Sequence, residues 1–396
     1  MKEPLHLAAA DCFALAHADH TQELWGKAHV IDARSPGEFE EDHLPSAVNW
    51  PVLNNAQRIL VGTLHRAEGA FAARRTGAAL VARNIATLLE THANALDPRL
   101  PLLVYCWRGG QRSGALATVL ARIGYRVAVL EGGYKGFRRE VIRQLPLLAA
   151  RLRFRVVAGR TGSGKTALLA QLRSHGQQVL DLEAIACHRG SVLGADPLSP
   201  QPSQRAFETG LWSALRQFDA RAPVWVEAES KRIGLCTLPD PLVDAMRGSP
   251  CLLLAVAVEV RTNFLLQEYP FWIENAQALH AALLRLQPLL GSATLQALQT
   301  MLACHAYQDF VRRLLQVHYD PLYDRALKRN YPAHALRVLS LEQLDAATLS
   351  RTAQELGAWD PLPASALGTE PGGKSLHLDP AAQGAHEGIG HDATFE

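Results

Sequence analysis

The stretch GRTGSGKT, residues 159–166, constrains the fold of this chain more than any other feature. It matches the pattern G-x-x-x-x-G-K-[ST] and lies between a strand-like run, RFRVVAG, and a helix-like run, GKTALLAQLRS. In that context the pattern forms a phosphate-binding loop, where a strand of a parallel sheet leads into a helix. We therefore predict a phosphate-binding loop between a strand and a helix of an α/β domain.

Each position of this loop has a chemical reason. Gly159, Gly162 and Gly164 let the backbone turn tightly, so that its N–H groups point inward. Lys165 supplies a positive charge, and the Thr166 hydroxyl can hold a magnesium ion. The helix that begins near Lys165 adds the positive end of its dipole.

A magnesium ion also needs an acidic partner, which should end a neighbouring strand. The segment VWVEAES offers Glu227, and VLDLE offers Asp181. Each carboxylate could equally cap the helix that follows its strand, so both interpretations stay open. No adenine-reading signature stands out, and a pyrophosphate-bearing substrate other than a nucleotide is therefore allowed.

The chain of 396 residues is long enough for two or three domains. Strand-like and helix-like segments alternate in a first block, and the alternation restarts at RFRVVAG, which is typical of α/β domains with parallel sheets. From about Glu274 the apolar residues recur only at helical spacing. We predict a first domain at 8–142, a phosphate-loop domain at 150–270, a wholly helical C-terminal subdomain at 271–358 and a disordered tail at 361–396.

Cysteine usage and hydropathy bear on the compartment. Six cysteines occur, at positions 12, 106, 187, 236, 251 and 304, without a C-x-x-C pair or a metal-ligand cluster, so we expect reduced thiols. Cys187 and Cys304 each precede a histidine, but adjacent residues point apart in regular structure, and we interpret both pairs as structural. No signal peptide or bilayer-length apolar run is evident. We expect a cytoplasmic protein with no membrane partner and no tightly bound cofactor.

Positive charge is concentrated in the window 108–165, which holds thirteen Lys or Arg residues and only two acids. Such clustering favours a polyanionic partner such as nucleic acid, although exposed helices also carry scattered arginines. The segment VHYDPLYDRALKRNY mixes Tyr319, Tyr323 and Tyr331 with basic residues. Contact with RNA and simple helix packing explain that mixture equally well.

A second anion site is indicated by CWRGGQRS, residues 106–113, which lies between the strand-like PLLVY and a helix-like stretch. A thiol at a helix N-terminus, beside Arg108 and Arg112, should have a lowered pKa and exist largely as thiolate. Cys106 is therefore predicted to be a nucleophile.

Three separated signatures together resemble a rhodanese domain over about residues 8–142: VIDARSPGEFEEDHLPSAVNWPV, the cysteine loop and LEGGYKGF. The first signature carries Asp32, Arg34, Glu38, Phe39, His43, Pro45 and Ala47. The resemblance implies an α/β rhodanese-like fold in which the loop cysteine carries a persulfide. We predict that Asp32 and Arg34 brace the cysteine loop through an ion pair.

The cysteine loop is one residue longer than the common rhodanese pattern C-x-x-G-x-R-S. Its spacing from Cys106 to Arg112 is C-x5-R, as in cysteine-dependent phosphatases, whose wider loop seats a tetrahedral phosphate. Tyr105 stands where those enzymes usually have histidine, and no convincing general acid can be assigned, although Asp32 stays a candidate. The wider cradle favours an anion larger than one sulfur atom.

The two loops, with HRGS at 188–191 and ESKRIG at 229–234, resemble the tRNA 2-selenouridine synthases over about residues 8–345. The resemblance implies replacement of sulfur by selenium in the wobble 2-thiouridine of tRNA, with selenophosphate, made by a supplier enzyme, as donor. It also implies transfer of a geranyl group from geranyl diphosphate to the thiouridine sulfur, which makes that sulfur a better leaving group. The basic window would face tRNA phosphates.

On this basis the sequence predicts two steps at two sites. At the phosphate loop, Lys165, Thr166 with magnesium and the loop amides stabilise the departing diphosphate. At the cysteine loop, Cys106 takes selenium as a perselenide, and Arg108 and Arg112 hold the phosphate. Two other interpretations stay open: a P-loop-coupled sulfurtransferase or cysteine-dependent phosphatase acting on a small molecule, and a non-catalytic RNA-binding regulator.

Overall fold

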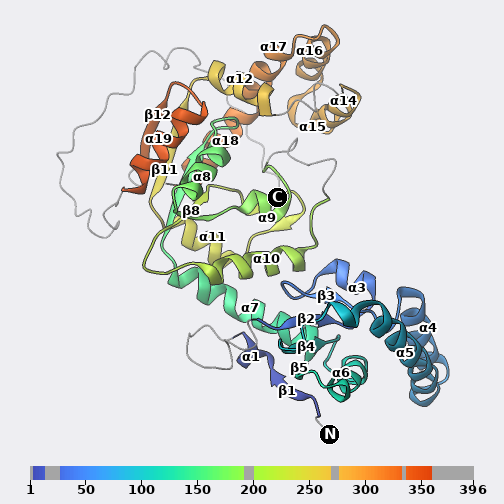
Figure 1. Ribbon diagram of the computed structural model, residues 1–396. Coiled ribbons are helices and arrows are strands. Elements are labelled where there is room, and N and C mark those ends of the chain that lie inside the picture. The colour runs from blue at the N-terminus through green and yellow to red at the C-terminus, as the bar shows by residue number, and fades with distance from the viewer. Residues whose placement is uncertain (1–2, 14–26, 191–199, 269–275, 332–335, 359–396) are drawn as a thin grey trace. The chain divides into compact units, whose positions relative to one another are not determined.

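The computed structural model describes residues 3–13, 27–190, 200–268, 276–331 and 336–358, which belong to one compact unit (Figure 1). The prediction of a disordered tail at 361–396 lies outside the described residues. Within the described ranges, no helix has the length and hydrophobicity needed to cross a membrane. All six cysteines are described, and all are free thiols.

The first block forms a five-stranded parallel sheet in the order β1-β5-β4-β2-β3. Its strands are β1 (Leu5–Ala8), β2 (His29–Asp32), β3 (Val48–Asn49), β4 (Leu102–Tyr105) and β5 (Val127–Glu131). Strand β4 reads LLVY and is buried at every position, as expected for a central strand covered on both faces. The cysteine loop leaves this strand at its carboxyl end, where ligands bind in open parallel sheets.

Helices of the first block surround this sheet. They are α1 (Ala9–Cys12), α3 (Pro36–Glu41), α4 (Asn55–Ala67), α5 (Ala70–His92), a 3-10 turn (Ala93–Ala95), α6 (Gln111–Ile123) and α7 (Gly133–Arg151). The insertion between β3 and β4 folds into α4 and α5, which pack side by side (Figure 1). Helix α4 begins where Asn54 accepts a hydrogen bond from the backbone N–H of Gln57.

The second block forms another five-stranded parallel sheet, in the order β12-β11-β6-β8-β7. Its strands are β6 (Phe154–Gly159), β7 (Gln178–Leu180), β8 (Val224–Glu227), β11 (Cys251–Val256) and β12 (Leu336–Leu341), and a short antiparallel pair joins β9 (Arg232–Ile233) to β10 (Cys236–Thr237). With two parallel sheets and a mainly helical C-terminal part, the predicted α/β fold class is confirmed.

Helices again cover the second sheet and then dominate the C-terminal part. They are α8 (Lys165–Ser174), α9 (Leu182–Ala186), α10 (Gln204–Gln217), α11 (Asp240–Arg247), α12 (Val258–Glu268), α14 (Ala276–Leu284), α15 (Gln287–Leu290), α16 (Ser292–Ala303), α17 (Tyr307–Leu314), a π-helical turn (Leu315–Tyr319), α18 (Asp320–Asn330) and α19 (Ala346–Gly357).

The prediction that 271–358 is wholly helical is wrong at one element. Residues 336–341 form β12, which pairs in parallel with β11 at the edge of the sheet. The short stretch LRVLSL fits either structure by its own pattern, and pairing with β11 satisfies its backbone hydrogen bonds.

Helix α7 connects the two sheets, because it follows β5 of the first and ends shortly before β6 of the second. It packs against α10 and α11. Phe137 of α7, Phe207 of α10 and Val226 of β8 belong to one continuous core, in which burial of each such side chain stabilises the fold by about 2–3 kcal/mol. The predicted first domain ends at residue 142 and the predicted second domain begins at residue 150, and α7 continues without a break between these two positions. The domain boundaries therefore stay predictions.

Candidate functional site

The segment GRTGSGKT forms the connection from β6 to α8. Gly162 and Gly164 have φ angles of +79° and +76°, in the left-handed region that favours glycine. A Cβ atom on Gly162 would lie 2.8 Å from the side chain of Leu265, so helix α12 packs directly on the loop. The first glycine, Gly159, is the last residue of β6, and its carbonyl accepts a hydrogen bond from Lys165 Nζ at 2.8 Å.

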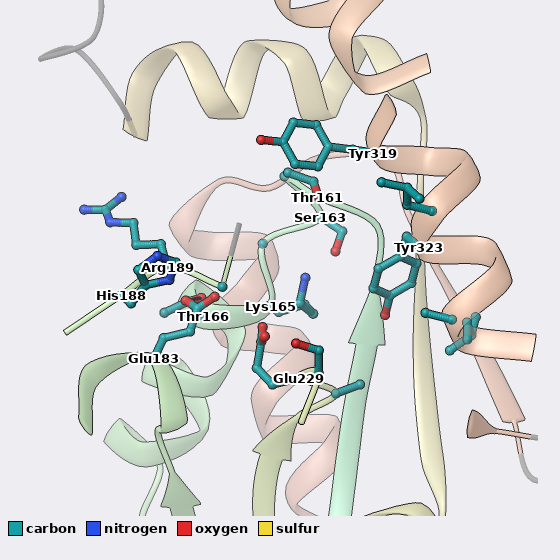
Figure 2. Close-up of a pocket in the computed structure, with 18 of the residues that line it drawn as sticks. Thr161, Ser163, Lys165, Thr166, Glu183, His188, Arg189, Glu229, Tyr319 and Tyr323 are labelled. Carbon is teal, nitrogen blue, oxygen red and sulfur yellow. Dashed lines mark hydrogen bonds between the residues drawn. The ribbon is translucent and has the colours of Figure 1, made fainter. Parts of the chain in front are cut away.

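A cavity of about 1050 Å³ opens over this loop (Figure 2). Gly162, Gly164, Lys165 and Thr166 form its floor, and the segments that follow β7 and β8 line one side. Helices α12 and α18 of the C-terminal part line another. The loop residues that the sequence singles out thus lie on the floor of the cavity, while the walls come from segments that are distant along the chain.

Two carboxylates that the sequence analysis did not single out lie beside the predicted phosphate ligands (Figure 2). Thr166 Oγ1 donates a hydrogen bond to Glu183 Oε2 at 3.0 Å. Burial raises the pKa of Glu183, although the charge of Lys165 opposes the shift. Burial and the charge of Glu183 raise the pKa of Glu229 to about 7. A bound cation would relieve the repulsion between these two acids.

The residues present fit a magnesium ion at this point. Magnesium is usually held by one or two carboxylates together with substrate phosphates. The Thr166 hydroxyl and the Glu183 carboxylate could hold it here, since they lie in contact at the edge of the loop. In the described part of the chain, no group of three or more His, Cys, Asp or Glu residues could hold a metal alone. A magnesium ion at this point would therefore need further ligands from a bound phosphate or from water.

Glu227, the magnesium partner that the sequence suggested, is placed elsewhere. It is 2% exposed, it does not line the cavity, and its Oε1 accepts the backbone N–H of Glu183 at 2.9 Å. Asp181 accepts the N–H of Ala184 at 2.9 Å. Both carboxylates therefore cap helix α9, and the acid beside Thr166 is Glu183 instead. The cause is local, because α9 begins directly after β7 and leaves its first N–H groups to be satisfied.

The wall of the cavity is fixed to the phosphate loop by a buried ion pair. Arg261 of α12 donates to both carboxylate oxygens of Asp320 in α18, at 2.9 and 2.7 Å, and to the carbonyl of Thr161 in the loop at 3.1 Å. The hydroxyl of Tyr323 accepts the backbone N–H of Gly159 at 2.6 Å. Helices α12 and α18 thus fix the position of the phosphate loop through these hydrogen bonds.

This wall is largely apolar and aromatic. Its apolar and aromatic side chains are Phe264, Leu265, Tyr319, Leu322, Tyr323, Ala326, Leu327 and Tyr331, and the same segments add Glu268, His318, Arg329 and Asn330. Tyr331 is buried in the core, whereas Tyr319 and Tyr323 are half-buried (Figure 2). The sequence left RNA contact and packing equally open for these tyrosines. In the structure Tyr323 and Tyr331 pack beside the cavity, and both also line it. The apolar wall could hold an apolar group next to a phosphate bound at the loop.

The mouth of the cavity carries five exposed basic residues. They are Arg189, Lys231, Arg232, Arg247 and Arg329. The acidic residues that line the same cavity are half-buried, with the exception of Glu268. Arg189 lies 3.9 Å from Glu268 and Lys231 lies 2.5 Å from Asp240, so part of this charge is balanced within the protein. The exposed Arg232, Arg247 and Arg329 suit a polyanion approaching from solvent.

The basic window 108–165 does not supply one continuous surface. Arg138 forms an ion pair with Glu208, and Arg155 is buried. Arg160 pairs with Asp324 at 2.6 Å. The prediction that the window faces tRNA phosphates is wrong for Arg138 and Arg155, which are buried, whereas Arg160 is exposed. A charge count along the chain does not tell which side chains share a face.

The cysteine loop places its thiol at the start of α6. Cys106 is 4% exposed, and its Sγ accepts a hydrogen bond from Ser113 Oγ at 3.1 Å. Burial raises the pKa of Cys106, but the side-chain and backbone hydrogen bonds of Ser113, the charge of Arg112 and the N–H of Arg108 together bring it below its ordinary value. The predicted thiolate therefore has a structural cause. The Arg108 side chain is exposed at the loop.

Arg112 is held in place by a carboxylate from α3. Its two terminal nitrogens donate to Glu38 Oε2 at 2.8 Å and Oε1 at 3.3 Å. Burial acts to raise the pKa of Glu38, but the hydrogen bonds and charge of Arg112 and the bonds from Ser35 lower it to about 2. Glu38 therefore remains ionised and orients Arg112.

Asp32 and Arg34 form the predicted ion pair, with Arg34 Nη2 and Asp32 Oδ2 at 2.6 Å. The guanidinium also lies 4.0 Å from the ring centroid of Tyr134, whose backbone N–H donates to the carbonyl of Cys106 at 2.8 Å. Gly133 lies so close that a Cβ atom there would be 2.2 Å from the same carbonyl. The pair thus supports the cysteine loop indirectly, through the LEGGYKGF segment.

The Ser113 hydroxyl gives a direct test of how the thiolate is stabilised. We expect Ser113→Ala to raise the pKa of Cys106, because it removes one hydrogen bond to the thiolate. At pH values below the native pKa of Cys106, alkylation by iodoacetamide should slow by roughly tenfold, the equivalent of one charged hydrogen bond. The midpoint of its pH profile should move upward. An unchanged profile would mean that the hydroxyl does not stabilise the thiolate.

Two family models match separate parts of this chain, and each part contains one of the two loops. The family model described as "tRNA 2-selenouridine synthase AAA domain" matches residues 152–346. The model described as "Rhodanese-like domain" matches residues 17–140. The first range contains the phosphate loop and its cavity, and the second contains the cysteine loop.

Several curated relatives are similar over most of their length. A tRNA 2-selenouridine synthase of Sulfurovum sp. is 31% identical over 332 residues, which cover 76% of this chain and 89% of the relative. That of Marinobacter nauticus is 32% identical and covered to 88%, with 75% of this chain aligned. That of Hahella chejuensis is 33% identical and covered to 86%, with 76% of this chain aligned.

Proposed function

The chain belongs to the tRNA 2-selenouridine synthase family, and from this premise we propose that it replaces the sulfur of wobble 2-thiouridine in tRNA by selenium in two steps at two sites. The first step attaches a geranyl group to the sulfur, and the second exchanges the geranylated sulfur for selenium. Membership in a family named for tRNA sets aside the small-molecule and non-catalytic interpretations. An enzyme of tRNA is expected to work in the cytoplasm.

The first step is assigned to the cavity over the phosphate loop. Geranyl diphosphate would place its diphosphate against the loop amides and Lys165, and its apolar chain against the wall that includes Phe264 and Leu322. The thiouridine sulfur attacks the carbon that bears the diphosphate, and the C–O bond breaks. Lys165 stabilises the charge on the departing diphosphate. Magnesium, when held by Thr166 and Glu183, supplies further positive charge against that leaving group.

The second step is assigned to the cysteine loop. Selenophosphate would bind where the Cys106 thiolate, the loop N–H groups and Arg112 converge. Arg108 adds a second positive charge from the solvent side of the loop. The donor comes from an enzyme that makes selenophosphate, so a supplier of that compound is the expected partner.

One observation carries this proposal: a single chain of this family holds an activated thiol in an anion loop and, separately, a phosphate loop beneath an apolar wall. The test is mass analysis of the nucleosides of 2-thiouridine tRNA after incubation with the purified protein. Geranyl diphosphate alone should give the geranylated nucleoside, and addition of selenophosphate should give 2-selenouridine. Unmodified nucleosides, with a known synthase active in parallel, would reject the proposal.

The basic mouth of the cavity should bind the phosphates next to the target nucleotide. We expect the triple variant Arg232→Gln/Arg247→Gln/Arg329→Gln to bind tRNA at least about tenfold more weakly, with a salt dependence reduced by about two in log–log slope. Filter binding at several salt concentrations measures both quantities.

A matched control removes the same charge from the exposed surface of α4 and α5. It is Arg66→Gln/Arg75→Gln/Arg83→Gln. This control should bind tRNA as the native protein does. Equal losses in both variants would mean that binding follows total charge and not the mouth of the cavity.

A further inference from the structure

We propose that Cys106 attacks the phosphorus atom of selenophosphate, so that the cysteine loop is a phosphoryl-transfer site that releases selenium as hydrogen selenide. This inference rests on the proposed function, in which selenophosphate is consumed at this loop. It replaces the perselenide that the sequence predicts. One chemical argument and three structural observations support it. The argument is the electron balance of the reaction. The observations are the spacing of the loop, the position of Arg112 and the hydrogen bonds that occupy the buried carboxylates.

Electron balance separates the two possible targets of the thiolate. If sulfur bonded to selenium, the electron pair of the P–Se bond would stay on phosphorus and give a product at the level of phosphite. Release of phosphate would then need an oxidant as an additional reactant. Attack on phosphorus needs none, because the S–P bond forms while the P–Se bond breaks and the electron pair leaves with selenium.

The remaining bonds also balance. Water attacks the phosphorus of the phosphocysteine, the S–P bond breaks, and phosphate leaves while the Cys106 thiolate is restored. Hydrogen selenide adds to C2 of the geranylated uridine and expels geranylthiol, which carries away a proton. The sum consumes selenophosphate, water and the geranylated uridine and yields phosphate, geranylthiol and 2-selenouridine, with no change of oxidation level at phosphorus.

The geometry of the loop suits a phosphoryl group. The C-x5-R spacing gives a loop wide enough for a tetrahedral anion, and the backbone N–H groups of Arg108 and Ser113 donate to the thiolate. Arg112 has five N–H donors, and its two terminal nitrogens each donate one hydrogen bond to Glu38. The donors that remain can bind the equatorial oxygens of a phosphoryl group in transit.

The buried carboxylates explain which phosphorus compounds this loop can cleave. Asp32 is fully buried and bonded to Arg34 through both oxygens, which removes it as a general acid. Glu38 holds Arg112, and Asp42 accepts the hydroxyl of Tyr134 at 2.8 Å. These are the buried acids among the described residues of the first block. A leaving alkoxide needs protonation, whereas selenide and sulfide leave as anions. The loop should therefore cleave P–Se and P–S bonds and spare alkyl phosphates.

The experiment uses the full chain and inorganic thiophosphate, in which sulfur replaces selenium. After rapid denaturation, intact-protein mass analysis should show Cys106 carrying a phosphoryl group, and phosphate and sulfide should be released in equal amounts. Cys106→Ser should show neither. Arg112→Lys, which keeps the charge but loses the fork of donors, should slow phosphate release about 100-fold while iodoacetamide still alkylates the thiol. An alkyl phosphate should be left intact.

Two results would overturn the proposal. One is a Cys106 adduct with the mass of one sulfur atom, which would show attack on sulfur. The other is the absence of both an adduct and phosphate release. Either result can occur while the native protein still makes 2-selenouridine in tRNA, in which case the proposed function stands without this step. Phosphocysteine formation in a protein that leaves tRNA unmodified would instead reject the proposed function.

Discussion

Replacing Lys165 by alanine should abolish geranyl transfer to tRNA, with a loss in rate of about a thousandfold or more. Lys165 is the basic residue on the floor of the cavity, and its ammonium lies within the loop that would hold the diphosphate. Charge builds on the diphosphate only as the C–O bond breaks, so the lysine stabilises the transition state more than the bound donor. The rate should therefore fall much more than the affinity for geranyl diphosphate.

The measurement is the initial rate at which the geranylated nucleoside forms at saturating geranyl diphosphate, and mass analysis of the nucleosides monitors it. The matched control is Lys328→Ala, which removes an exposed lysine of α18 that does not line the cavity. That control should keep the native rate. A Lys165→Ala protein that folds normally and still transfers geranyl would show that this loop is not where the diphosphate leaves.

Cys106→Ser should abolish the entry of selenium and leave geranyl transfer at the native rate. A serine hydroxyl is not ionised at neutral pH, so the substitution keeps the shape of the loop but removes its nucleophile. The prediction holds whichever atom of selenophosphate is attacked. Because the thiol is buried in the loop of the first sheet, the cavity over the phosphate loop should be unaffected.

Nucleoside analysis with both donors present tests this prediction, since geranylated tRNA should accumulate in place of 2-selenouridine. Cys304→Ser replaces an exposed cysteine of the C-terminal helices and serves as the control, with native activity expected in both steps. Loss of geranyl transfer together with selenium entry in Cys106→Ser would contradict the division of labour between the two loops.

The sequence predicts the parts of both sites that are contiguous in the chain. The phosphate loop needs Gly162 and Gly164 for its left-handed turns, and the cysteine loop needs a thiol directly before a helix. Such motifs can be recognised in the sequence because their chemistry depends on residues that are neighbours along the chain. The α/β class follows in the same way from the repeated alternation of strands and helices.

The remainder of the cavity depends on tertiary placement, which no local pattern encodes. Glu229 belongs to a segment that the sequence analysis used only for its resemblance, and Glu183 lies in a short helix with no motif of its own. Arg261 and Asp320 are 59 residues apart and pair only because α12 and α18 meet over the loop. The sequence alone does not tell whether an acid at the end of a strand, such as Glu227, binds a metal or caps a neighbouring helix. In this structure Glu227 caps helix α9.

The most direct test of the account is a relay between the two variants. Cys106→Ser is used to prepare geranylated tRNA, which is purified and given to Lys165→Ala with selenophosphate, and the nucleosides are analysed by mass. The account predicts 2-selenouridine, because the second protein retains an intact cysteine loop and receives the product of the step that it lacks. Geranylated tRNA that stays unchanged with Lys165→Ala, while the native protein converts the same sample, would contradict the assignment of the two steps to two separate sites.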